Sequence, residues 1–368
     1  MRSGKCRYIM ASNYHRIIIK IGSNVLTQSN GLPDVARISH LVEQVAEIKK
    51  QGKEVILVSS GAVASGRSLI TIDEKVNSVA ARQLLASIGQ VKLINTYAEL
   101  FGTHQMLCSQ VLVTKEDFRD RMHYLNMKNC LEILLQHGVI PVVNENDVVS
   151  VTELMFTDND ELAGLIASML NAQALIILSN VDGLYDGNPK TPGTKVIEQI
   201  DDSSANFASF VSSDRSQFGR GGMLTKSNMA QKVAQLGITV HIANGTKDHI
   251  LTDVLAGKAI HTTFIPSKNT SGKKKWIAHS QNFAKGVVQV NEGAKTVLLS
   301  NKATSLLPIG VVSITTDFQK GDIIKLVDEA GKQIGLGIAE YGSDKARERI
   351  GQKKQRPLVH YDYLYLNA

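Results

Sequence analysis

Residues 16–26 read RIIIKIGSNVL, and this stretch decides the fold that the sequence predicts. Its run of isoleucines is typical of a buried strand, because β-branched side chains favour extended backbone. Lys20 lies inside the run, where burial of an ammonium group is costly unless the group meets an anion. Gly22 follows, and a glycine lets the backbone approach a ligand closely. The stretch therefore predicts a buried strand that ends at an anion site, although a lysine reaching from the strand end into solvent would also fit.

From Arg16 to about Phe264, short β-branched runs alternate with longer helical patterns. The further runs that predict strands are Glu54–Ser59, Gln110–Thr114, Val139–Asn144, Ala174–Ser179 and Ile238–Ala243. Amphipathic spacing predicts the helices Val35–Gln51, Ala80–Phe101 and Thr225–Leu236. Alternation of this kind implies right-handed crossovers between parallel strands, with both faces of the sheet covered. The predicted fold class is α/β, a three-layer α/β/α sandwich with a mainly parallel sheet.

The composition changes after Phe264. Residues 266–275, PSKNTSGKKK, are polar, basic and rich in turn formers, which is typical of a linker. After them, short runs split by turns predict the strands Gly286–Val290, Thr296–Leu299, Gly310–Thr315, Asp322–Val327 and Ile334–Ala339. We therefore predict a large domain over residues 15–264, a linker over 265–283 and a small, β-rich, barrel-like domain over 284–366.

The length of 368 residues suits two domains, and a composition of 43% hydrophobic and 20% charged residues is that of an ordinary globular protein. No apolar run approaches the roughly 20 residues needed to cross a bilayer, and the polar residues 1–14 do not resemble a secretory signal. Cys6, Cys108 and Cys130 are isolated, so the sequence predicts no metal site, no disulfide framework and a cytoplasmic protein. The excess of 41 Lys and Arg over 34 Asp and Glu is compatible with nucleotides or nucleic acid as partners.

Ligands of open α/β sheets bind beyond the carboxyl ends of the strands, where helix N-termini offer unpaired N–H groups to anions. Residues 58–63, VSSGAV, follow the second predicted strand and lead into a helix. Small hydroxyl and glycine residues at such a turn, here including Ser60, can form an anion site. Serine is also a favoured N-cap residue, so this turn alone decides little.

Two groups of carboxylates and amides follow an apolar strand. The first is Asn144-Glu145-Asn146-Asp147, and the second is Thr157-Asp158-Asn159-Asp160-Glu161, which opens an apolar helix. Asp and Asn offer acceptors for an α-ammonium group, and Asn offers donors for a carboxylate, so together they suit the two charged groups of an amino acid. Surface turns use the same residues, but both groups in one chain favour an amino-acid site.

Residues 218–226, FGRGGMLTK, run into a predicted helix. Glycines that allow close backbone approach, a helix N-terminus and a lysine are what a polyphosphate needs. The spacing is not that of a Walker A motif. A flexible surface loop would also contain such glycines, but a phosphate site is favoured.

Taken together, these motifs resemble the glutamate 5-kinase branch of the amino-acid kinase family. The matching stretches are IIIKIGSNVL (17–26), VSSGAVASG (58–66), PVVNENDVV (141–149), FTDNDELA (156–163), NVDGLYDGNP (180–189) and GRGGMLTK (219–226), in the family's order. Residues 292–294, 305–308 and 320–322 resemble the PUA domain that many glutamate 5-kinases carry. The two predicted domains would then be an amino-acid kinase catalytic domain and a PUA-like domain.

The resemblance implies an ATP-dependent kinase that converts the side-chain carboxylate of glutamate to glutamyl 5-phosphate, the first step of proline biosynthesis. Lys20 and Lys226 would contact the phosphates of ATP as catalytic residues, and Asp160 would orient both lysines. Glutamate would be held by Ser60, Asp147 and Asn159. The nucleotide would also contact Ser179, Asn180, Arg220, Gly221, Gly222, Met223, Leu224 and Thr225.

The resemblance also implies Mg²⁺ held mainly through ATP, a homo-oligomer, and proline as a feedback inhibitor. This chain departs from the usual family motifs on the nucleotide side. Ser179-Asn180 stands where Thr-Asp is usual, and Arg220 stands where a threonine commonly precedes the glycines.

Two competing interpretations remain open at this point. Another member of the same kinase family would act on a different carboxylate, carbamate or phosphate. Alternatively, the basic residues Lys345, Arg347, Arg349, Lys353, Lys354 and Arg356 would bind RNA through the C-terminal domain. A charge run is usually a solvated face, and no aromatic-rich segment for base stacking accompanies it, so the kinase is favoured.

Overall fold

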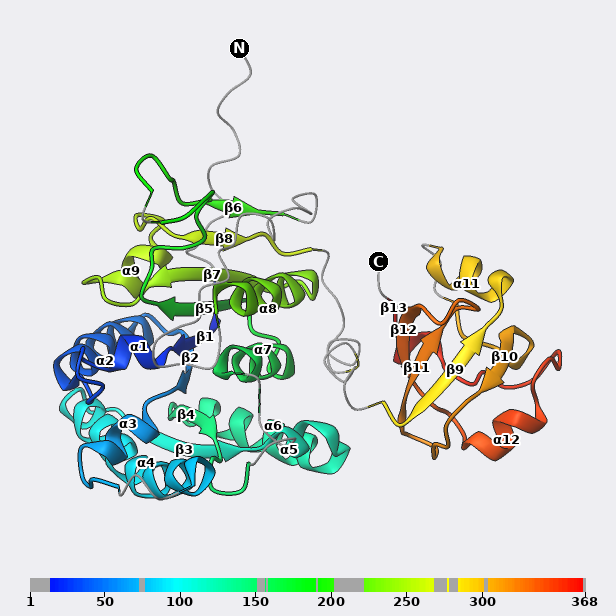
Figure 1. The fold of residues 1–368 in the computed structure, drawn as a ribbon, viewed down its shortest axis with the longest axis horizontal. Helices are drawn as coiled ribbons and strands as arrows, with labels where there is room; N and C mark the ends of the chain where they lie inside the picture. Colours follow the sequence, from blue (N-terminus) through cyan, green and yellow to red (C-terminus); the bar gives the residue numbers. More distant parts are fainter. Residues whose placement is uncertain are drawn as a thin grey trace, which may run out of the picture. The chain divides into compact units, whose positions relative to one another are not determined.

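The computed structural model describes residues 14–72, 77–150, 156, 158–189, 191–201, 222–267, 277, 284–300 and 304–366, without the side chains of Arg119 and Arg121. The chain divides into two compact units, one up to Asn269 and one from Thr270 (Figure 1). The domain bounds of 15–264 and 284–366 remain a prediction.

The first unit is built on an eight-stranded sheet with the order β3-β4-β2-β1-β5-β7-β8-β6. Its strands are β1 (Arg16–Ile21), β2 (Glu54–Ser59), β3 (Cys108–Val113), β4 (Ile140–Glu145), β5 (Ala174–Ser179), β6 (Gln199–Ile200), β7 (Thr239–Asn244) and β8 (Thr262–Phe264). All neighbouring strands are parallel except β7 and β8, which are antiparallel. The predicted mainly parallel sheet is confirmed, with strand ends shifted by at most two residues.

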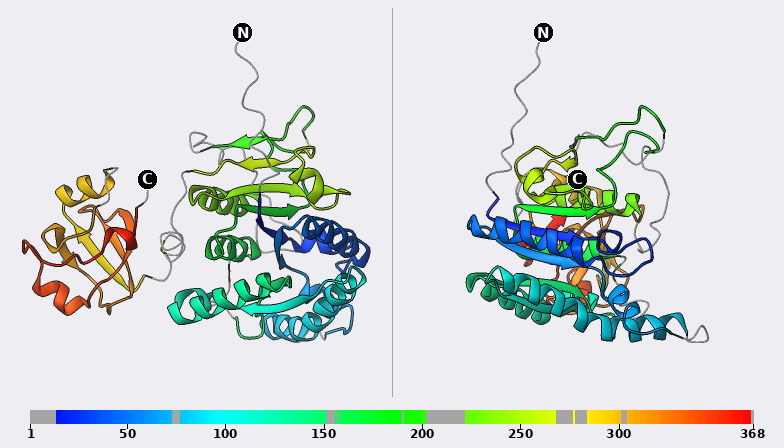
Figure 2. Two further views of the ribbon diagram at one scale, coloured as in Figure 1. Left: turned by 180° about the vertical axis from the view of Figure 1, so that it is seen from behind. Right: turned by 90° about the vertical axis from the view of Figure 1, so that its left-hand side faces the viewer.

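Helices cover both faces of this sheet (Figure 2). They are α1 (Ser23–Leu26), α2 (Val35–Lys50), α3 (Ala62–Arg67), α4 (Ser78–Thr103), α5 (Lys115–Arg119), α6 (Arg121–Gln136), α7 (Asn159–Met169), α8 (Met223–Gln235) and α9 (Ile250–Leu255). Buried residues of α2, α4 and α9 share one core cluster, whereas α7 and α8 contact each other and pack on β1, β5 and β7. Among the helices described, none is long and apolar enough to span a bilayer.

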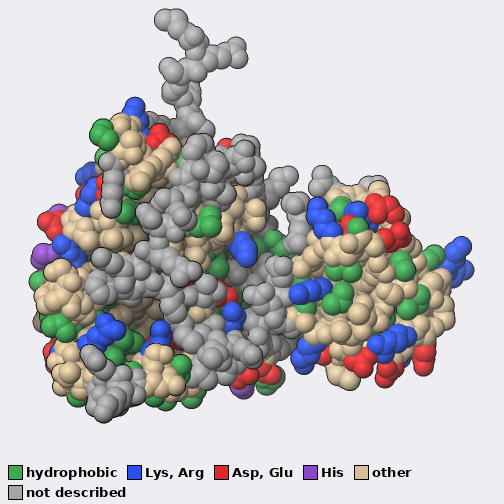
Figure 3. Space-filling view, viewed as in Figure 1, with side chains coloured by type: hydrophobic (Ala, Val, Ile, Leu, Met, Phe, Trp, Pro, Cys, Tyr) green, Lys and Arg blue, Asp and Glu red, His purple; other side chains and the backbone are tan. Residues whose placement is uncertain are grey.

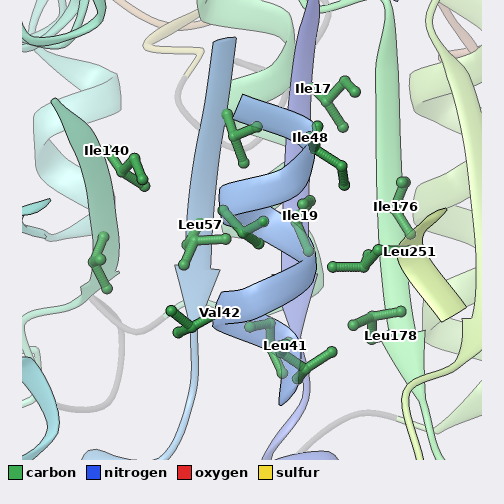
Figure 4. Packing of buried hydrophobic residues seen from close by; sticks show 14 of the residues in the cluster. Ile17, Ile19, Leu41, Val42, Ile48, Leu57, Ile140, Ile176, Leu178 and Leu251 are labelled. Atoms are coloured by element: carbon green, nitrogen blue, oxygen red, sulfur yellow. The ribbon is translucent and has the colours of Figure 1, made fainter. Parts of the chain in front are cut away.

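The central strand β1 divides its side chains between the two faces. Ile17, Ile19 and Ile21 belong to the core under α2, where Figure 4 shows Ile17 and Ile19 beside Ile48. Because successive side chains of a strand point to opposite faces, Lys20 faces the other layer, toward α7. The same alternation that builds the core therefore directs the one charged side chain of β1's buried segment toward the opposite helix.

The second unit contains a five-stranded sheet with the order β10-β9-β11-β12-β13. Its elements are β9 (Gly286–Val290), α11 (Glu292–Leu299), the 3-10 turn η5 (Pro308–Gly310), β10 (Val311–Ile314), β11 (Ile323–Val327), β12 (Gln333–Ile338), α12 (Ser343–Glu348), the 3-10 turn η6 (Tyr361–Tyr363) and β13 (Leu364–Leu366). Side chains of both charge signs lie on the face of this unit that Figure 3 shows. Within the basic run, Arg347 pairs with Asp317 and Asp344.

One predicted strand of the second unit is wrong. Residues Thr296–Leu299 form the end of helix α11. Asn291 caps this helix, since its side chain accepts a hydrogen bond from the Ala294 N–H at 2.8 Å, and Glu292 lies in the first turn. The short apolar run could not distinguish strand from helix, and the cap preceding it decides the structure.

Two glycines allow helices α3 and α4 to touch. A Cβ atom on Gly66 would overlap the carbonyl group of Leu85, and one on Gly89 would overlap the carbonyl oxygen of Ala62. Neither obstacle is the end of a flexible side chain, so relief would require movement of backbone. The approach positions the turn between β2 and α3, which contains Ser60 and Gly61.

We expect Gly89→Ala to destabilise the first unit by roughly 1–3 kcal/mol, because the added methyl group has no room between the two backbones. Gly102→Ala is the matched control on the same helix, since a Cβ there meets no atom within 4 Å. Alanine should stabilise that position by up to about 1 kcal/mol through helix propensity. Urea unfolding of both variants tests this, and a shift of the same sign in both would contradict it.

Candidate functional site

A cavity of about 760 Å³ lies at the carboxyl edge of the sheet in the first unit. Its walls come from the ends of β1, β2, β4 and β5, from the first turns of α7 and α8, and from α3 and α4. Strand β1 has β2 on one side and β5 on the other, so the strand order reverses here. Open α/β sheets bind ligands at such a reversal, beyond the carboxyl ends of the strands.

Three charged side chains meet at the base of the cavity. Lys20 Nζ lies 2.6 Å from Asp160 Oδ1, and Lys226 Nζ lies 3.2 Å from Asp160 Oδ2. Asp160 is fully buried in the first turn of α7. Burial alone would raise the pKa of Asp160, but the two ammonium groups outweigh it and hold that pKa below its usual value. The structure thus brings together the three predicted catalytic residues, with Lys226 near the start of helix α8.

Asp158 forms the N-cap of α7 beside this group. Its Oδ1 accepts hydrogen bonds from the N–H groups of Asp160 at 3.0 Å and Glu161 at 3.1 Å. Burial raises the pKa of Asp158 to about 6, and the charge of Asp160 contributes in the same direction. A second carboxylate therefore borders the site with a pKa close to neutrality.

A chain of polar side chains links three of the cavity's walls. The Asn159 amide nitrogen donates to Ser60 Oγ at 3.0 Å and to Asn144 Oδ1 at 3.1 Å. The Asn144 amide nitrogen in turn donates to Gln90 Oε1 at 3.0 Å, from helix α4. Because the amide nitrogens are the donors in these hydrogen bonds, the carbonyl oxygen of Asn159 can still accept a hydrogen bond from a ligand. The Ser60 hydroxyl, which accepts from Asn159, can still donate one. Asn144 belongs to the first predicted group of carboxylates and amides, whereas Gln90 was not predicted as a site residue.

Asp147 forms an ion pair with Arg82, which no sequence motif predicts as a site residue. Arg82 Nε and Nη2 donate to Asp147 Oδ1 at 3.1 and 2.6 Å, and both residues line the cavity. The neighbouring Gln83 donates to the Val148 carbonyl oxygen at 2.7 Å. Arg82 lies in the helical pattern of α4, 65 positions before Asp147, so no local motif joins the two.

The predicted nucleotide residues lie partly in the cavity wall. Ser179 and Asn180, at the end of β5, line the cavity. Gly222 is the N-cap of α8, and residues 223–225 form its first turn ahead of Lys226. Arg220 and Gly221 lie outside the described residues, as does Thr157.

A second network of polar side chains, around Asp182, was not predicted from the sequence. Asp182 Oδ1 accepts hydrogen bonds from Asn244 Nδ2 at 2.9 Å and lies 2.8 Å from Lys247 Nζ. It ties the loop after β5 to the loop after β7, beside the predicted nucleotide residues. Asp182 and Asn244 are more than 60 positions apart, so only the structure shows that they are in contact.

Comparison with known proteins agrees with this architecture. Residues 15–244 match the model of the amino acid kinase family, and residues 286–361 match the PUA domain. The chain therefore belongs to the amino acid kinase family. It is 54% identical to the glutamate 5-kinase of Bacteroides thetaiotaomicron over 97% of this chain and 100% of that protein. It is 51% identical to the glutamate 5-kinase of Chlorobaculum tepidum over 96% and 98% of the two chains.

The fold is also similar to a solved structure. The carbamate kinase from Giardia lamblia bound to AMP-PNP superposes with a TM-score of 0.51 at 19% sequence identity. The match covers 70% of this chain and 100% of that one. At this identity the likeness concerns the fold alone.

The raised pKa of Asp158 predicts that Asp158→Asn stabilises the protein more at pH 7.5 than at pH 4.5. The wild-type folded state holds its proton up to about pH 6, whereas the unfolded chain loses it near pH 3.9, so wild-type stability falls as pH rises through this window. Asparagine keeps an oxygen for the helix cap and has no proton to lose. The pH-dependent gain should be roughly 1–3 kcal/mol.

Urea midpoints of the two proteins at both pH values test this prediction. Taking the difference between wild type and variant cancels the titrating groups that do not interact with Asp158. A difference that does not change with pH would mean that Asp158 has an ordinary pKa.

Proposed function

We propose that this chain transfers the γ-phosphoryl group of ATP to the side-chain carboxylate of glutamate, giving glutamyl 5-phosphate and ADP, the first step of proline biosynthesis. The observation that carries the proposal is the pair Lys20 and Lys226 converging on one buried carboxylate. Two glutamate 5-kinases that match nearly the whole chain at more than 50% identity support the choice of substrate.

The reaction needs no general base, because a carboxylate with a pKa near 4.3 is already ionised at neutral pH. The carboxylate oxygen forms a bond to the γ-phosphorus as the bond from that phosphorus to the β–γ bridging oxygen breaks. Two anions must be aligned, and the charge spread over the transferred group must be stabilised. Lys20 and Lys226 supply two positive charges in a buried setting, and Asp160 fixes the spacing between them.

Glutamate would be held by Ser60, Asp147 and Asn159. The Asn159 carbonyl oxygen and the Asp147 carboxylate suit an ammonium group, while the Ser60 hydroxyl suits a carboxylate oxygen. The hydrogen bonds from Asn159 to Asn144 and from Asn144 to Gln90 hold the Asn159 side chain in this orientation.

ATP would contact Ser179, Asn180 and residues 220–226, where the N-terminus of α8 favours phosphate. Mg²⁺ would be bound through the nucleotide, since the ion keeps several waters and commonly binds substrate phosphates with few protein ligands. The family resemblance supports, as further parts of the proposal, a cytoplasmic homo-oligomer that proline inhibits.

The substrate assignment predicts that ADP release depends on glutamate. Assayed side by side, glutamate should support turnover, while aspartate, N-acetylglutamate and carbamate should not. Asp147→Ala and Asn159→Ala should raise KM for glutamate about 30-fold or more and change KM for ATP little, because lost partners of a charged ligand cost ~2–5 kcal/mol. If KM for both substrates rises equally, these residues maintain the structure and do not select the acceptor.

The lysine pair predicts a loss of rate in Lys20→Met and Lys226→Met. Methionine keeps much of the side-chain volume and removes the charge, so kcat should fall about 10²–10³-fold. KM for ATP can rise as well, which makes kcat the cleaner measurement.

Lys128→Met is the matched control and should keep its activity, because among the described residues Lys128 forms an ion pair with Glu132 alone, within α6. Thermal unfolding must show that the lysine variants are folded, because each leaves Asp160 with one ammonium group. Folded variants with undiminished kcat would exclude electrostatic stabilisation by this pair.

A further inference from the structure

Four cationic side chains line the cavity among the residues described: Lys20, Arg67, Arg82 and Lys226. Lys20 and Lys226 converge on Asp160. Arg82 instead contacts Asp147 just beyond β4, and β4 is separated from β1 by β2. Strands lie about 4.8 Å apart, so the ends of β1 and β4 are separated by roughly 10 Å along the edge of the sheet. A cation is therefore available away from the site of phosphoryl transfer.

We propose that Arg82 binds the α-carboxylate of glutamate and thereby selects a free α-amino acid as the acceptor. This inference rests on the proposed function, and it assigns a specificity-determining residue within the same cavity.

The geometry of the Arg82–Asp147 pair leaves donors for a ligand. A guanidinium group carries five N–H donors, and among the described residues the structure shows partners only for Nε and Nη2, both on the same oxygen of Asp147. Nη1 has no partner within the described part of the chain. About one third of the Arg82 side chain is exposed, whereas Asp147 is buried. Arg82 is therefore anchored at one edge and open at the other, which suits a planar carboxylate.

The pair also matches the charges of a free amino acid. Glutamate carries an ammonium group and a carboxylate on the same carbon, and Asp147 and Arg82 present a negative and a positive group in direct contact. An acylated amine or an amidated α-carboxyl group would leave one member of the pair without its partner in a partly buried site. Such a mismatch discriminates strongly between otherwise similar ligands.

Arg67 is the competing candidate for the same role. It ends helix α3, lines the cavity and has no ion pair with any residue that the structure describes. An exposed, unanchored arginine must lose rotamer freedom when it binds a ligand. Arg82 has already lost that freedom through Asp147, so its donors are preorganised.

The test compares glutamate with its α-amide, isoglutamine, which keeps the ammonium group and the side-chain carboxylate. Wild type should prefer glutamate by about 10²-fold in kcat/KM. Arg82→Gln should reduce this preference to about threefold or less, through loss of activity on glutamate, because the amide never used the guanidinium charge. Arg82→Lys should retain part of the preference, since it keeps the charge and loses the fork of donors.

Lys92→Gln is the control on the same helix, because Lys92 contacts Ser68 and does not line the cavity. If Arg82→Gln lowers kcat/KM equally for both substrates, Arg82 only holds Asp147 in place and the inference is overturned. It is also overturned if the preference collapses in Arg67→Gln and survives in Arg82→Gln. Should Arg82→Gln fail to fold, Arg82→Lys decides, with an unchanged preference counting against the inference. A wild type that phosphorylates neither compound would instead refute the proposed function itself.

Discussion

One fully buried carboxylate held between two ammonium groups is the constraint on which the rest of the first unit depends. Asp160 has no exposed surface, so leaving it ionised and unpaired would cost several kcal/mol. Its two partners come from β1 and α8, and Asp160 itself opens α7. These three elements must therefore meet before the core is complete. The two lysines give this group of three side chains a net charge of +1, which attracts anions.

Much of this could be predicted from the local pattern around β1. The isoleucine run predicts a buried strand. Because successive side chains of a strand point to opposite faces of the sheet, Lys20 is expected on the face opposite to that of Ile19 and Ile21. The cost of burying an ammonium group then requires an anion nearby. The pattern could not say that this anion would be Asp160, because the contact spans 140 residues. The sequence placed Lys226 near the start of the predicted helix Thr225–Leu236, but it could not show that this helix begins beside Asp160.

The parts that the sequence did not predict are contacts without a local signal. Arg82 lies among apolar helix residues and becomes a site residue only because α4 crosses the end of β4. Gln90 looked like any polar position on the same helix, yet it fixes the orientation of Asn144. The error at Thr296–Leu299 has a different cause. A run of four apolar or β-branched residues fits the repeat of a strand as well as that of a helix. The helix is indicated instead by Asn291, a favourable N-cap residue before the run.

Helix α4 shows how selection of the acceptor can be separated from transfer of the phosphoryl group. Among the described residues it forms no ion pair with Lys20 or Lys226, and in the proposed function it supplies Arg82 and Gln90 to the acceptor side. Its close approach to α3 depends on Gly89, which lies between those two residues on the same helix. A substitution on the cavity face of α4 would therefore change which carboxylate is held while the Lys20–Asp160–Lys226 group remains in place. In the proposed function α4 would serve the acceptor side alone, whereas α7 would serve both tasks, because its first turn contains both Asn159 and Asp160.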